Sequence, residues 1–421
     1  MTDVKLAGSL WLTRVVARTF AGFGDLVAEL DRPARQRNPY PLYSEIRSRG
    51  PWYRSRLGLY ATASHGVITE LVRHPEISSG VLGGEAGGAT AKAAFPADAI
   101  HPLRDSLTGI DPPDHTRLRR LVVPAFTPRA SRARAEQIER IVDELISKLP
   151  KGEPFDLIEH FTAQLPVLVM CDLLGVPVTE VHRLTRWGRV VGAAGDGVRT
   201  VAQSRELTVV LAEMEQFFRD LLERRKADPG EDVISRILHE ANGEPTPREL
   251  IALCELTLLA GFETLVNFIG TALLALLTNP EQLALLRGDL DLVPQTVDEA
   301  LRFDAPIQST LRAVRSDLEI DGHVLPAGKP IIVLYGGANR DPAVFEHPDR
   351  FDITRPNSRD HLAFAAGTHY CLGASLAKLE GEIALRALVT RLPGLKPAGE
   401  VEWLNSFVVR GLRRLPVVVS P

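Results

Sequence analysis

Cysteine is scarce in this sequence, since only Cys171, Cys254 and Cys371 occur among 421 residues. They lie far apart and form no CxxC pair, which disfavours a disulfide framework or a cysteine-rich zinc site and fits a reducing cytoplasm. An excess of one charge is also missing. The 49 Lys and Arg residues nearly balance the 53 Asp and Glu residues, and the net charge of −4 argues against a dedicated nucleic-acid binder.

Near the N-terminus the sequence has no long apolar run. Lys5, Arg14 and Arg18 interrupt the first apolar stretch, and its longest charge-free part, residues 6–13, is too short for a signal peptide or a membrane span. An amphipathic helix over residues 6–20 that lies on a membrane surface is one interpretation. We favour the other, in which residues 1–37 form a helical extension packed on the protein's own surface.

Signals for a nucleotide-binding sheet are absent too, because the sequence contains no GxGxxG or GxxxxGK[ST] motif and no alternation of strands and helices. Strand patterns are confined to residues 59–62, 318–334 and 407–419. Within the second range, Asp321-Gly322 suits a tight hairpin. The remainder has mostly helical patterns, so the sequence predicts a mainly α protein with small β-sheets. Residues 80–98, rich in glycine, predict a long loop that is either a binding loop or a surface excursion.

One long buried helix is predicted from Thr246 to residue 277. Thr246 can cap this helix, Pro247 suits its first turn, and Glu249 completes a capping box, whereas Thr278-Asn279-Pro280 ends it. The segment is apolar nearly all round, which is typical of a helix in the protein interior. A membrane span is disfavoured because Glu255 and Glu263 interrupt the segment.

The middle of this helix contains Ala260-Gly261-Phe262-Glu263-Thr264. A glycine inside a helix costs about 1 kcal/mol relative to alanine, and an unpartnered buried carboxylate costs more. These residues therefore suggest a cavity in which Glu263 and Thr264 handle protons. Close helix packing at Ala260-Gly261, with Glu263 in a salt bridge, is the alternative.

Cys371 directly precedes a helix predicted from Ala374 to residue 392. Backbone N–H groups at a helix start favour a thiolate, and Gly367 and Gly373 permit tight turns and a close approach to a flat ligand. Such a thiolate can be a nucleophile or a metal ligand. A single soft ligand without zinc-type partners fits the proximal ligand of a haem, whereas a buried structural cysteine is the alternative.

Together these segments resemble the cytochrome P-450 superfamily of soluble bacterial, more narrowly actinobacterial, type. Residues 364–373 are similar to the family's Phe-Gly-x-Gly-x-His-x-Cys-x-Gly signature, except that Ala365 replaces the first glycine. Glu299-Ala300-Leu301-Arg302 matches Glu-x-x-Arg, and residues 339–342 and 351–355 match the family's meander region. The resemblance implies one cytochrome P-450 domain over residues 38–421, with a helix-rich lobe and a smaller lobe that contains β-strands.

The resemblance also implies roles for individual residues. Cys371 would be the axial ligand of haem b. Glu299, Arg302 and Arg355 would form a buried ion network that holds the Cys371 loop, with Arg350 as the alternative third member. The remaining cofactor-binding positions implied by the resemblance are His115, Arg119, Arg312 and His369, which would contact the haem propionates, together with Phe364, Gly367 and Ala260.

As catalytic residues the resemblance implies Glu263 and Thr264, an acid–alcohol pair that serves oxygen activation. It predicts a monooxygenase that inserts one atom of dioxygen into an apolar substrate, with electrons from an external ferredoxin and ferredoxin reductase. Coupling or desaturation chemistry and a non-catalytic haem protein are the alternatives. We expect an acidic ferredoxin to dock on an arginine-rich segment formed by Arg117, Arg120, Arg129, Arg132 and Arg134. An ordinary solvated surface without a partner is an equally open interpretation of these arginines.

The expected substrate pocket is apolar. We expect its walls to come from the 80–110 loop, the 256–264 helix face, residues 307–311 and the turn at 405–408, with Leu256, Leu259, Ile307 and Phe407 as its apolar side chains. The chain is expected to be a cytoplasmic monomer without a membrane span and without a nucleic-acid partner.

Overall fold

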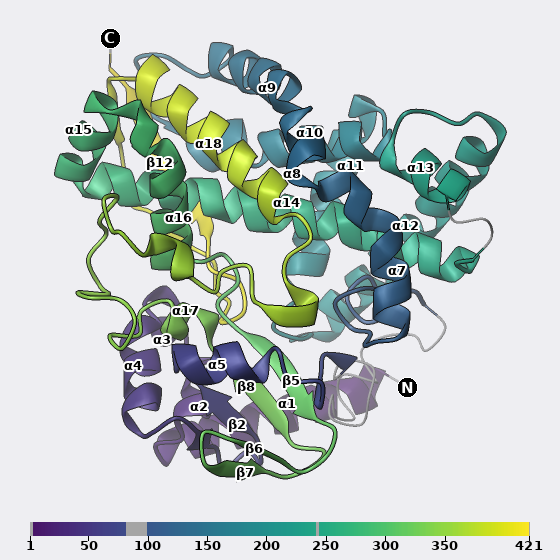
Figure 1. Cartoon of the computed structure of the whole chain (residues 1–421), viewed down its shortest axis with the longest axis vertical. Helices are drawn as coiled ribbons and strands as arrows, with labels where there is room; N and C mark the ends of the chain where they lie inside the picture. Colours follow the sequence, from purple (N-terminus) through teal and green to yellow (C-terminus); the bar gives the residue numbers. More distant parts are fainter. Residues whose placement is uncertain (1–2, 81–98, 241–243, 421) are drawn as a thin grey trace.

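Helices make up most of the computed structural model, which describes residues 3–80, 99–240 and 244–420. Figure 1 shows most of them gathered in a large upper lobe. Its α-helices are α7 (Asp114–Val122), α8 (Pro128–Arg132), α9 (Ala135–Ser147), α10 (Gln164–Leu174), α11 (Val181–Gly192), α12 (Val201–Ala227), α13 (Val233–Glu240), α14 (Pro247–Thr278), α15 (Pro280–Gly288), α16 (Val293–Phe303) and α18 (Ala374–Arg391). Short helical turns connect them, namely η3 (Val123–Phe126), η4 (Ile158–Thr162), η5 (Val178–Glu180), η6 (Leu290–Leu292), η7 (Ser358–Asp360) and η8 (Gly367–His369).

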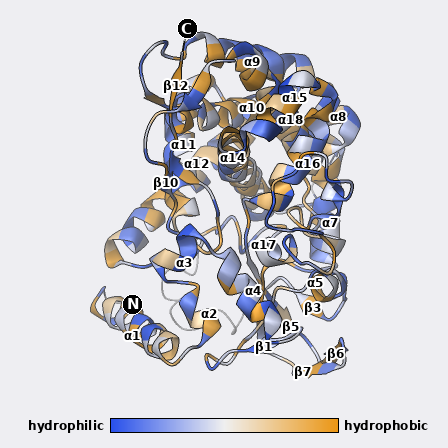
Figure 2. Cartoon of the chain, turned by 90° about the vertical axis from the view of Figure 1, so that its left-hand side faces the viewer, coloured by the Kyte–Doolittle hydropathy of each residue, from blue (hydrophilic) through white to orange (hydrophobic). Residues whose placement is uncertain are grey.

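The long helix α14 runs through the middle of this lobe, and Figure 2 shows it end-on among the other helices. The predicted capping box is present, since the Thr246 side chain accepts from the Glu249 N–H and the Glu249 side chain accepts from the Thr246 N–H. Helices α10, α11, α12, α16 and α18 all pack against α14. By length and composition α14 could cross a membrane, but 72% of its most apolar window is buried inside the protein. The prediction of an interior helix is confirmed.

The smaller lobe holds a sheet with the strand order β1-β2-β8-β5-β3. Strands β2 and β8 are parallel and the other pairs are antiparallel, so the sheet joins chain segments that are far apart in sequence. The strands are β1 (Tyr53–Arg54), β2 (Tyr60–Thr62), β3 (Ile77–Ser78), β5 (Thr310–Val314) and β8 (Pro330–Val333). Helices of this lobe are α1 (Asp3–Gly22), α2 (Leu26–Glu29), α3 (Pro33–Arg37), α4 (Tyr40–Ser48), α5 (His65–Leu71) and α17 (Tyr335–Ala338) (Figure 1).

Three further small sheets complete the described fold. They are the hairpin β6 (Leu318–Ile320)–β7 (His323–Leu325), the pair β10 (Glu402–Trp403)–β11 (Leu412–Arg414), and the sheet β4 (Phe155–Asp156)–β12 (Pro416–Val419)–β9 (Leu395–Pro397). The predicted turn at Asp321-Gly322 is confirmed, because both residues have positive φ angles, 52° and 71°, between β6 and β7.

The prediction that strands are confined to three places was wrong. Strands β1, β3, β4, β5, β9 and β10 lie outside the predicted ranges. Each has only two to five residues, too few for an alternating pattern to stand out, and each is stabilised by a partner strand, which for β3 and β4 comes from far away in the sequence. The predicted long loop at residues 80–98 falls outside the described residues except for Gly80. The overall prediction of a mainly α protein with small sheets is confirmed.

Candidate functional site

Cys371 lies at the end of a tight loop that leads into α18. The backbone N–H of Cys371 donates to the carbonyl of Phe364 (2.9 Å), and the Ala365 N–H donates to the Leu362 carbonyl (2.9 Å). Two residues of the loop have positive φ angles, Ala365 at 56° and Gly367 at 68°. A Cβ atom on Gly367 would also overlap the carbonyl of Val72. Gly367 is thus required by the backbone, whereas Ala365 is an alanine in a conformation that favours glycine.

The surroundings of the Cys371 thiol act on its charge in opposite directions. Burial raises the pKa of Cys371, while the backbone N–H of Gly373 and the guanidinium of Arg119 lower it. Burial is the largest of these effects, so the helix start alone does not produce the thiolate that the sequence suggested. A thiol of this kind loses its proton when it coordinates a metal ion. No group of three or more potential metal-ligating side chains occurs within residues 3–80, 99–240 and 244–420, which leaves Cys371 as a single ligand.

A cluster of cationic and imidazole side chains surrounds the Cys371 loop. Helix α7 presents His115 and Arg119 one turn apart, and Arg119 Nη2 donates to the Tyr370 carbonyl (2.6 Å). The His115 ring lies 4.4 Å from the ring of His369, centroid to centroid. His115 is only 1% exposed, and both of its ring nitrogens lack a hydrogen-bond partner among the described residues. Buried orphan nitrogens are rare, and they fit a site that supplies donors to a bound anionic group.

The other two predicted anion-binding residues have partners within the protein. The Nδ1 atom of His369 lies 3.1 Å from the Leu107 carbonyl, and its Nε2 atom lies 3.7 Å from Asp111. Arg312, on β5, is buried and donates from Nη1 to Thr310 Oγ1 and to the Leu311 carbonyl. The structure thus brings His115, Arg119 and His369 together, while the side-chain hydrogen bonds of Arg312 in the described part of the chain stay within β5. Burial, followed by the neighbouring His369 and Arg119, lowers the pKa of His115 to about 4.

A buried ion network supports the same loop from behind. Arg302 makes two hydrogen bonds to Glu299, from Nε (2.7 Å) and Nη2 (2.8 Å), and both side chains are fully buried. Arg355 Nε adds a third contact to Glu299 (3.2 Å). Arg350 contributes only its carbonyl, to Arg302 Nη2 (3.0 Å), so Arg355 is the third member.

The ion network reaches the Cys371 loop through Asn339. Arg302 Nη1 donates to the Asn339 carbonyl (2.9 Å), and the Asn339 side chain accepts from the Leu362 N–H (2.6 Å). Leu362 begins the loop described above, since its carbonyl accepts from Ala365. A continuous chain of hydrogen bonds therefore joins the buried carboxylate of Glu299 to the backbone that carries Cys371.

Halfway along α14 the helix has an open side. Ala260 is exposed although Leu258 and Leu259 beside it are buried. Thr264 Oγ1 donates to the Ala260 carbonyl (2.7 Å), which fixes the hydroxyl at this opening. Gly261 meets the side chain of Met170, so the predicted close packing is also present. Both interpretations of this segment hold in part, with the packing at Gly261 and the opening at Ala260.

The Glu263 carboxyl lies against Gly192 at the end of α11, where a Cβ atom would overlap it. Burial raises the pKa of Glu263 to about 7, and the Asp196 carboxyl adds to this increase. Asp196, in the α11–α12 connection, accepts from Ser406 Oγ (2.8 Å) and from the Val408 N–H (3.0 Å). Burial raises the pKa of Asp196 as well. In the part of the chain that is described, Glu263 forms no salt bridge, so of that alternative only the close packing at Gly261 is observed.

Sequence reasoning missed Gly192 and Asp196. Asp196 lies in the sequence Gly195-Asp196-Gly197, which indicates only a turn. Nothing local marks either residue as a neighbour of Glu263, because the packing of α11 on α14 brings them together.

The predicted pocket walls divide into two groups. Leu256 and Leu259 are buried in the large helical core. Ile307 forms an isolated bridge with Val409, and the Phe407 carbonyl accepts from Ser309 Oγ (3.1 Å), so these two walls lie in adjoining segments. Ile307 and Phe407 pack on the two clusters of the smaller lobe, so the four side chains do not belong to one hydrophobic cluster.

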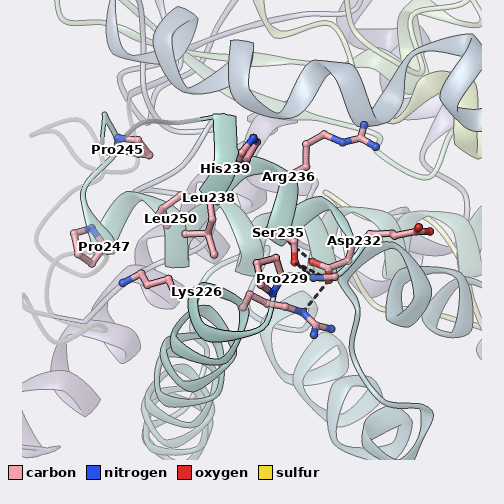
Figure 3. A pocket seen from close by; sticks show the side chains of 13 residues that line it. Lys226, Pro229, Asp232, Ser235, Arg236, Leu238, His239, Pro245, Pro247 and Leu250 are labelled. Carbon is pink, nitrogen blue, oxygen red and sulfur yellow. Dashed lines mark hydrogen bonds and ion pairs between the residues drawn. The ribbon is translucent and has the colours of Figure 1, made fainter.

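An open hollow of about 860 Å³ lies elsewhere, between the end of α12, α13 and the start of α14. Figure 3 shows Lys226, Arg236 and His239 around it, together with the side chain of Asp232. Arg225 pairs with Asp232 there (2.8 Å). None of the predicted site residues lines this hollow. It is therefore separate from the site around Cys371.

The expected arginine surface is partly neutralised by acidic partners. Arg117 pairs with Asp114 (3.1 Å) and with Glu249, and Arg120 pairs with Glu244 (2.9 Å). Arg134 pairs with Asp172. Docking of a ferredoxin on these five arginines stays a prediction, and three of them already have acidic partners within the protein. Arg129 and Arg132, both exposed on α8, form no ion pair within the described residues.

Comparison with known proteins agrees with this geometry. The family model for Cytochrome P450 matches residues 202–393. The 6-deoxyerythronolide B hydroxylase of Saccharopolyspora erythraea is 39% identical over 77% of this chain and 80% of its own length. The Vitamin D(3) 25-hydroxylase of Pseudonocardia autotrophica is 34% identical over 91% of this chain and 94% of its own. Among solved structures, ligand-free CYP164A2 of Mycobacterium smegmatis superposes with a TM-score of 0.85 at 35% identity, covering 94% of this chain and 99% of that one.

Proposed function

Because this chain belongs to the cytochrome P450 family and is a bacterial P450 monooxygenase, we propose that it holds haem b through Cys371 and oxidises a large apolar substrate with electrons from a ferredoxin. The open side of α14 at Ala260 and Thr264 is the observation that carries the proposal. It supports a reaction chamber in an otherwise buried helix.

The donor set around Cys371 fits a haem. Cys371 would hold the haem iron through its thiolate, and His115, Arg119, His369 and Arg312 would bind the propionates. The orphan ring nitrogens of His115 support this role, because a propionate would give them the hydrogen bond that they lack. Phe364, Gly367 and Ala260 line the haem faces. When bound, haem supplies the iron that activates dioxygen, and its thiolate ligand favours O–O cleavage.

Glu263 and Thr264 handle the protons that the reaction consumes. With a pKa of about 7, Glu263 can take up and release a proton near neutral pH. Thr264 Oγ1 is held by the Ala260 carbonyl at the open side of the helix, so it is oriented before any substrate binds. The charge of the Asp196 carboxyl raises the pKa of Glu263 further and so helps keep that carboxyl protonated.

Electrons come from an acidic ferredoxin that docks on α7 and α8. Arg120, Arg129 and Arg132 are exposed there, and α8 packs against α18, which begins directly after Cys371. Replacing Arg129 and Arg132 by Glu should slow reduction by ferredoxin at least tenfold at low salt, because steering by charge is lost. Arg49→Glu, at the end of α4 in the smaller lobe, is the control and should leave the rate unchanged. Equal rates in all three proteins would exclude this docking surface.

The names of two relatives suggest the size of the substrate. One is named as a hydroxylase of 6-deoxyerythronolide B and the other of vitamin D(3), and both compounds are large and mostly apolar. Apolar side chains at Leu256, Leu259, Ile307 and Phe407 support a substrate of this class. Titrating the purified haem protein with each compound while recording the Soret band tests the class. A low- to high-spin shift with either supports it, and no shift with both contradicts it.

The reaction itself is tested by Thr264→Ala in a system reconstituted with ferredoxin and its reductase. We expect product per electron pair to fall at least about tenfold and hydrogen peroxide to rise, because a group positioned for proton transfer is lost. Thr278→Ala is the matched control, because Thr278 also donates to the carbonyl four residues before it (2.7 Å) but lies at the end of α14. Full coupling in Thr264→Ala, with an intact ferrous–CO band, would overturn the assignment.

A further inference from the structure

The first described helix, α1, carries apolar side chains on two sides, but the rest of the protein covers only one of these sides. Among its 20 residues only Leu6, Leu10 and Ala21 are buried, where α1 packs on α2 and α12. Figure 2 shows α1 at the edge of the molecule beside α2, outside the helical lobe. A helix with apolar side chains all round normally lies in a protein interior or a membrane. The outer side of α1 therefore lacks the cover that its composition calls for.

The uncovered side forms a continuous stripe. Val4, Trp11 and Val15 follow each other at intervals of seven and four residues, which places them on one face of the helix. Val4 is 81% exposed and Trp11 is 66% exposed, and Leu12 beside them is 56% exposed. Phe23, one residue past the end of α1, is 67% exposed. We call Val4, Trp11, Leu12, Val15 and Phe23 the outer stripe.

Basic side chains flank the outer stripe. Lys5 and Arg18 are exposed at its edges, and neither forms an ion pair in the part of the chain that the structure describes. The acidic Asp3 is neutralised by Arg205 of α12. Residues 1–37 together carry six Lys and Arg and four Asp and Glu, a net charge of +2, whereas the whole chain carries −4. The segment that contains the outer stripe, residues 1–37, thus has a net positive charge, whereas the rest of the chain has a net negative charge.

We propose that the outer stripe of α1 binds the surface of an anionic lipid bilayer. The apolar side chains would enter the boundary between headgroups and acyl chains, with the indole of Trp11 at the depth that tryptophan prefers. Lys5 and Arg18 would contact the anionic headgroups. A second copy of this chain fits less well, because a symmetric contact would bring these two cations of each copy together.

Contacts of α1 with its own chain hold the helix in the orientation that binding requires. Arg14 donates to the Arg199 carbonyl, and Asp3 pairs with Arg205, so the start and the middle of α1 are held near the start of α12. The outer stripe therefore faces solvent as a preformed surface and pays little ordering entropy on binding.

The test is cosedimentation of the full-length holoprotein with vesicles. Vesicles of phosphatidylcholine mixed with phosphatidylglycerol should pellet the protein, and pure phosphatidylcholine should bind it at least tenfold more weakly. Trp11→Ser combined with Leu12→Ser should weaken binding to the anionic vesicles at least tenfold. Val324→Ser is the matched control, because Val324 is also a highly exposed apolar residue (62%) but lies on the β7 strand of the hairpin.

The ferrous–CO spectrum shows that each variant is folded, and binding is measured without turnover, so the result does not depend on the proposed substrate or redox partner. The proposal is overturned if the wild-type protein stays in the supernatant with anionic vesicles, or if the double variant binds them as well as Val324→Ser does. It is also overturned if light scattering finds a dimer that the double variant dissociates, since the stripe would then cover a second copy.

Discussion

The loop that carries Cys371 and the α14 segment that carries Glu263 and Thr264 differ in how their polar groups are satisfied. Behind Cys371, the carboxylate of Glu299 accepts from Arg302, Arg355 and the Asp352 backbone. On α14, the carboxyl of Glu263 forms no hydrogen bond within the described residues and has another acid, Asp196, as its neighbour. Full pairing holds a ligand in a fixed position, whereas a group that must exchange protons is left without a strong partner.

The largest effect that tests this difference is expected from Glu299→Gln. This change leaves the guanidinium groups of Arg302 and Arg355 buried without their counter-charge, and breaking a buried ion pair costs about 3–5 kcal/mol. Urea denaturation monitored by circular dichroism should show this loss in the free energy of unfolding. Glu45→Gln is the control, since the exposed Glu45–Arg49 pair (3.5 Å) should contribute less than about 0.5 kcal/mol. Similar losses in the two variants would show that the network is not what stabilises the loop.

The Cys371 loop and the ion network behind it were also easier to predict from the sequence than the α14 segment. Glu299 and Arg302 lie one helical turn apart, and Cys371 lies within a compact motif, so local spacing carries the information. The capping box at Thr246 and the turn at Asp321-Gly322 were predictable for the same reason.

The surroundings of Glu263 on α14 depend instead on contacts between segments that are distant in the sequence. Asp196 and Gly192 reach Glu263 only through the packing of α11 on α14, and the ion pairs of Arg117 and Arg134 require the same kind of long-range information. Short strands such as β3 and β10 exist because of their partners rather than their own pattern. A single sequence names these residues but does not show which distant residues contact each other in the folded protein.

The second-largest effect is expected from Glu263→Gln, and its sign depends on pH. The pKa of Glu263 is about 7 in the folded protein against an ordinary value of 4.5. The folded state therefore binds the extra proton between these values, and stability falls as pH rises from about 4.5 to about 7. Gln does not ionise, so the variant should be more stable than the wild type above pH 7, by up to roughly 3 kcal/mol. Urea denaturation at several pH values measures the gain.

Glu255→Gln is the control for this pH dependence. Glu255 is fully buried in the same helix, and burial raises its pKa to about 9. The gain from Glu263→Gln should level off above about pH 7, whereas the gain from Glu255→Gln should continue to grow toward pH 9. If both gains level off at the same pH, the two carboxyls do not differ as their surroundings imply.

Gly192→Ala should have a smaller effect on stability but a specific one on Glu263. The added Cβ would overlap the Glu263 carboxyl, and overpacking of this kind costs about 1–3 kcal/mol. Displacing the carboxyl should also lower the coupling of electron use to product. Gly66→Ala, in α5, is the control, because no atom lies within 4 Å of its Cβ position. Replacing a helical glycine without a clash should stabilise by about 0.5–1 kcal/mol. Unchanged coupling in Gly192→Ala would mean that the position of Glu263 is not set by α11.

The smallest effect is expected in the loop of Cys371, at the residue that departs from the family signature. Ala365 has a φ angle of 56°, where a Cβ atom is unfavourable, so Ala365→Gly should remove this strain. The greater freedom of glycine in the unfolded chain offsets part of the gain, which leaves about 0.5–1 kcal/mol of added stability. Ala366→Gly is the control. Ala366 has a φ angle of −153° and a buried methyl group, so the same change there brings the entropic cost and loses that packing, and it should destabilise by about 1 kcal/mol. Thermal denaturation measures both changes in stability. A gain for Ala365→Gly together with a loss for Ala366→Gly would show that the Cys371 loop, although well paired, contains one residue in an unfavourable backbone conformation.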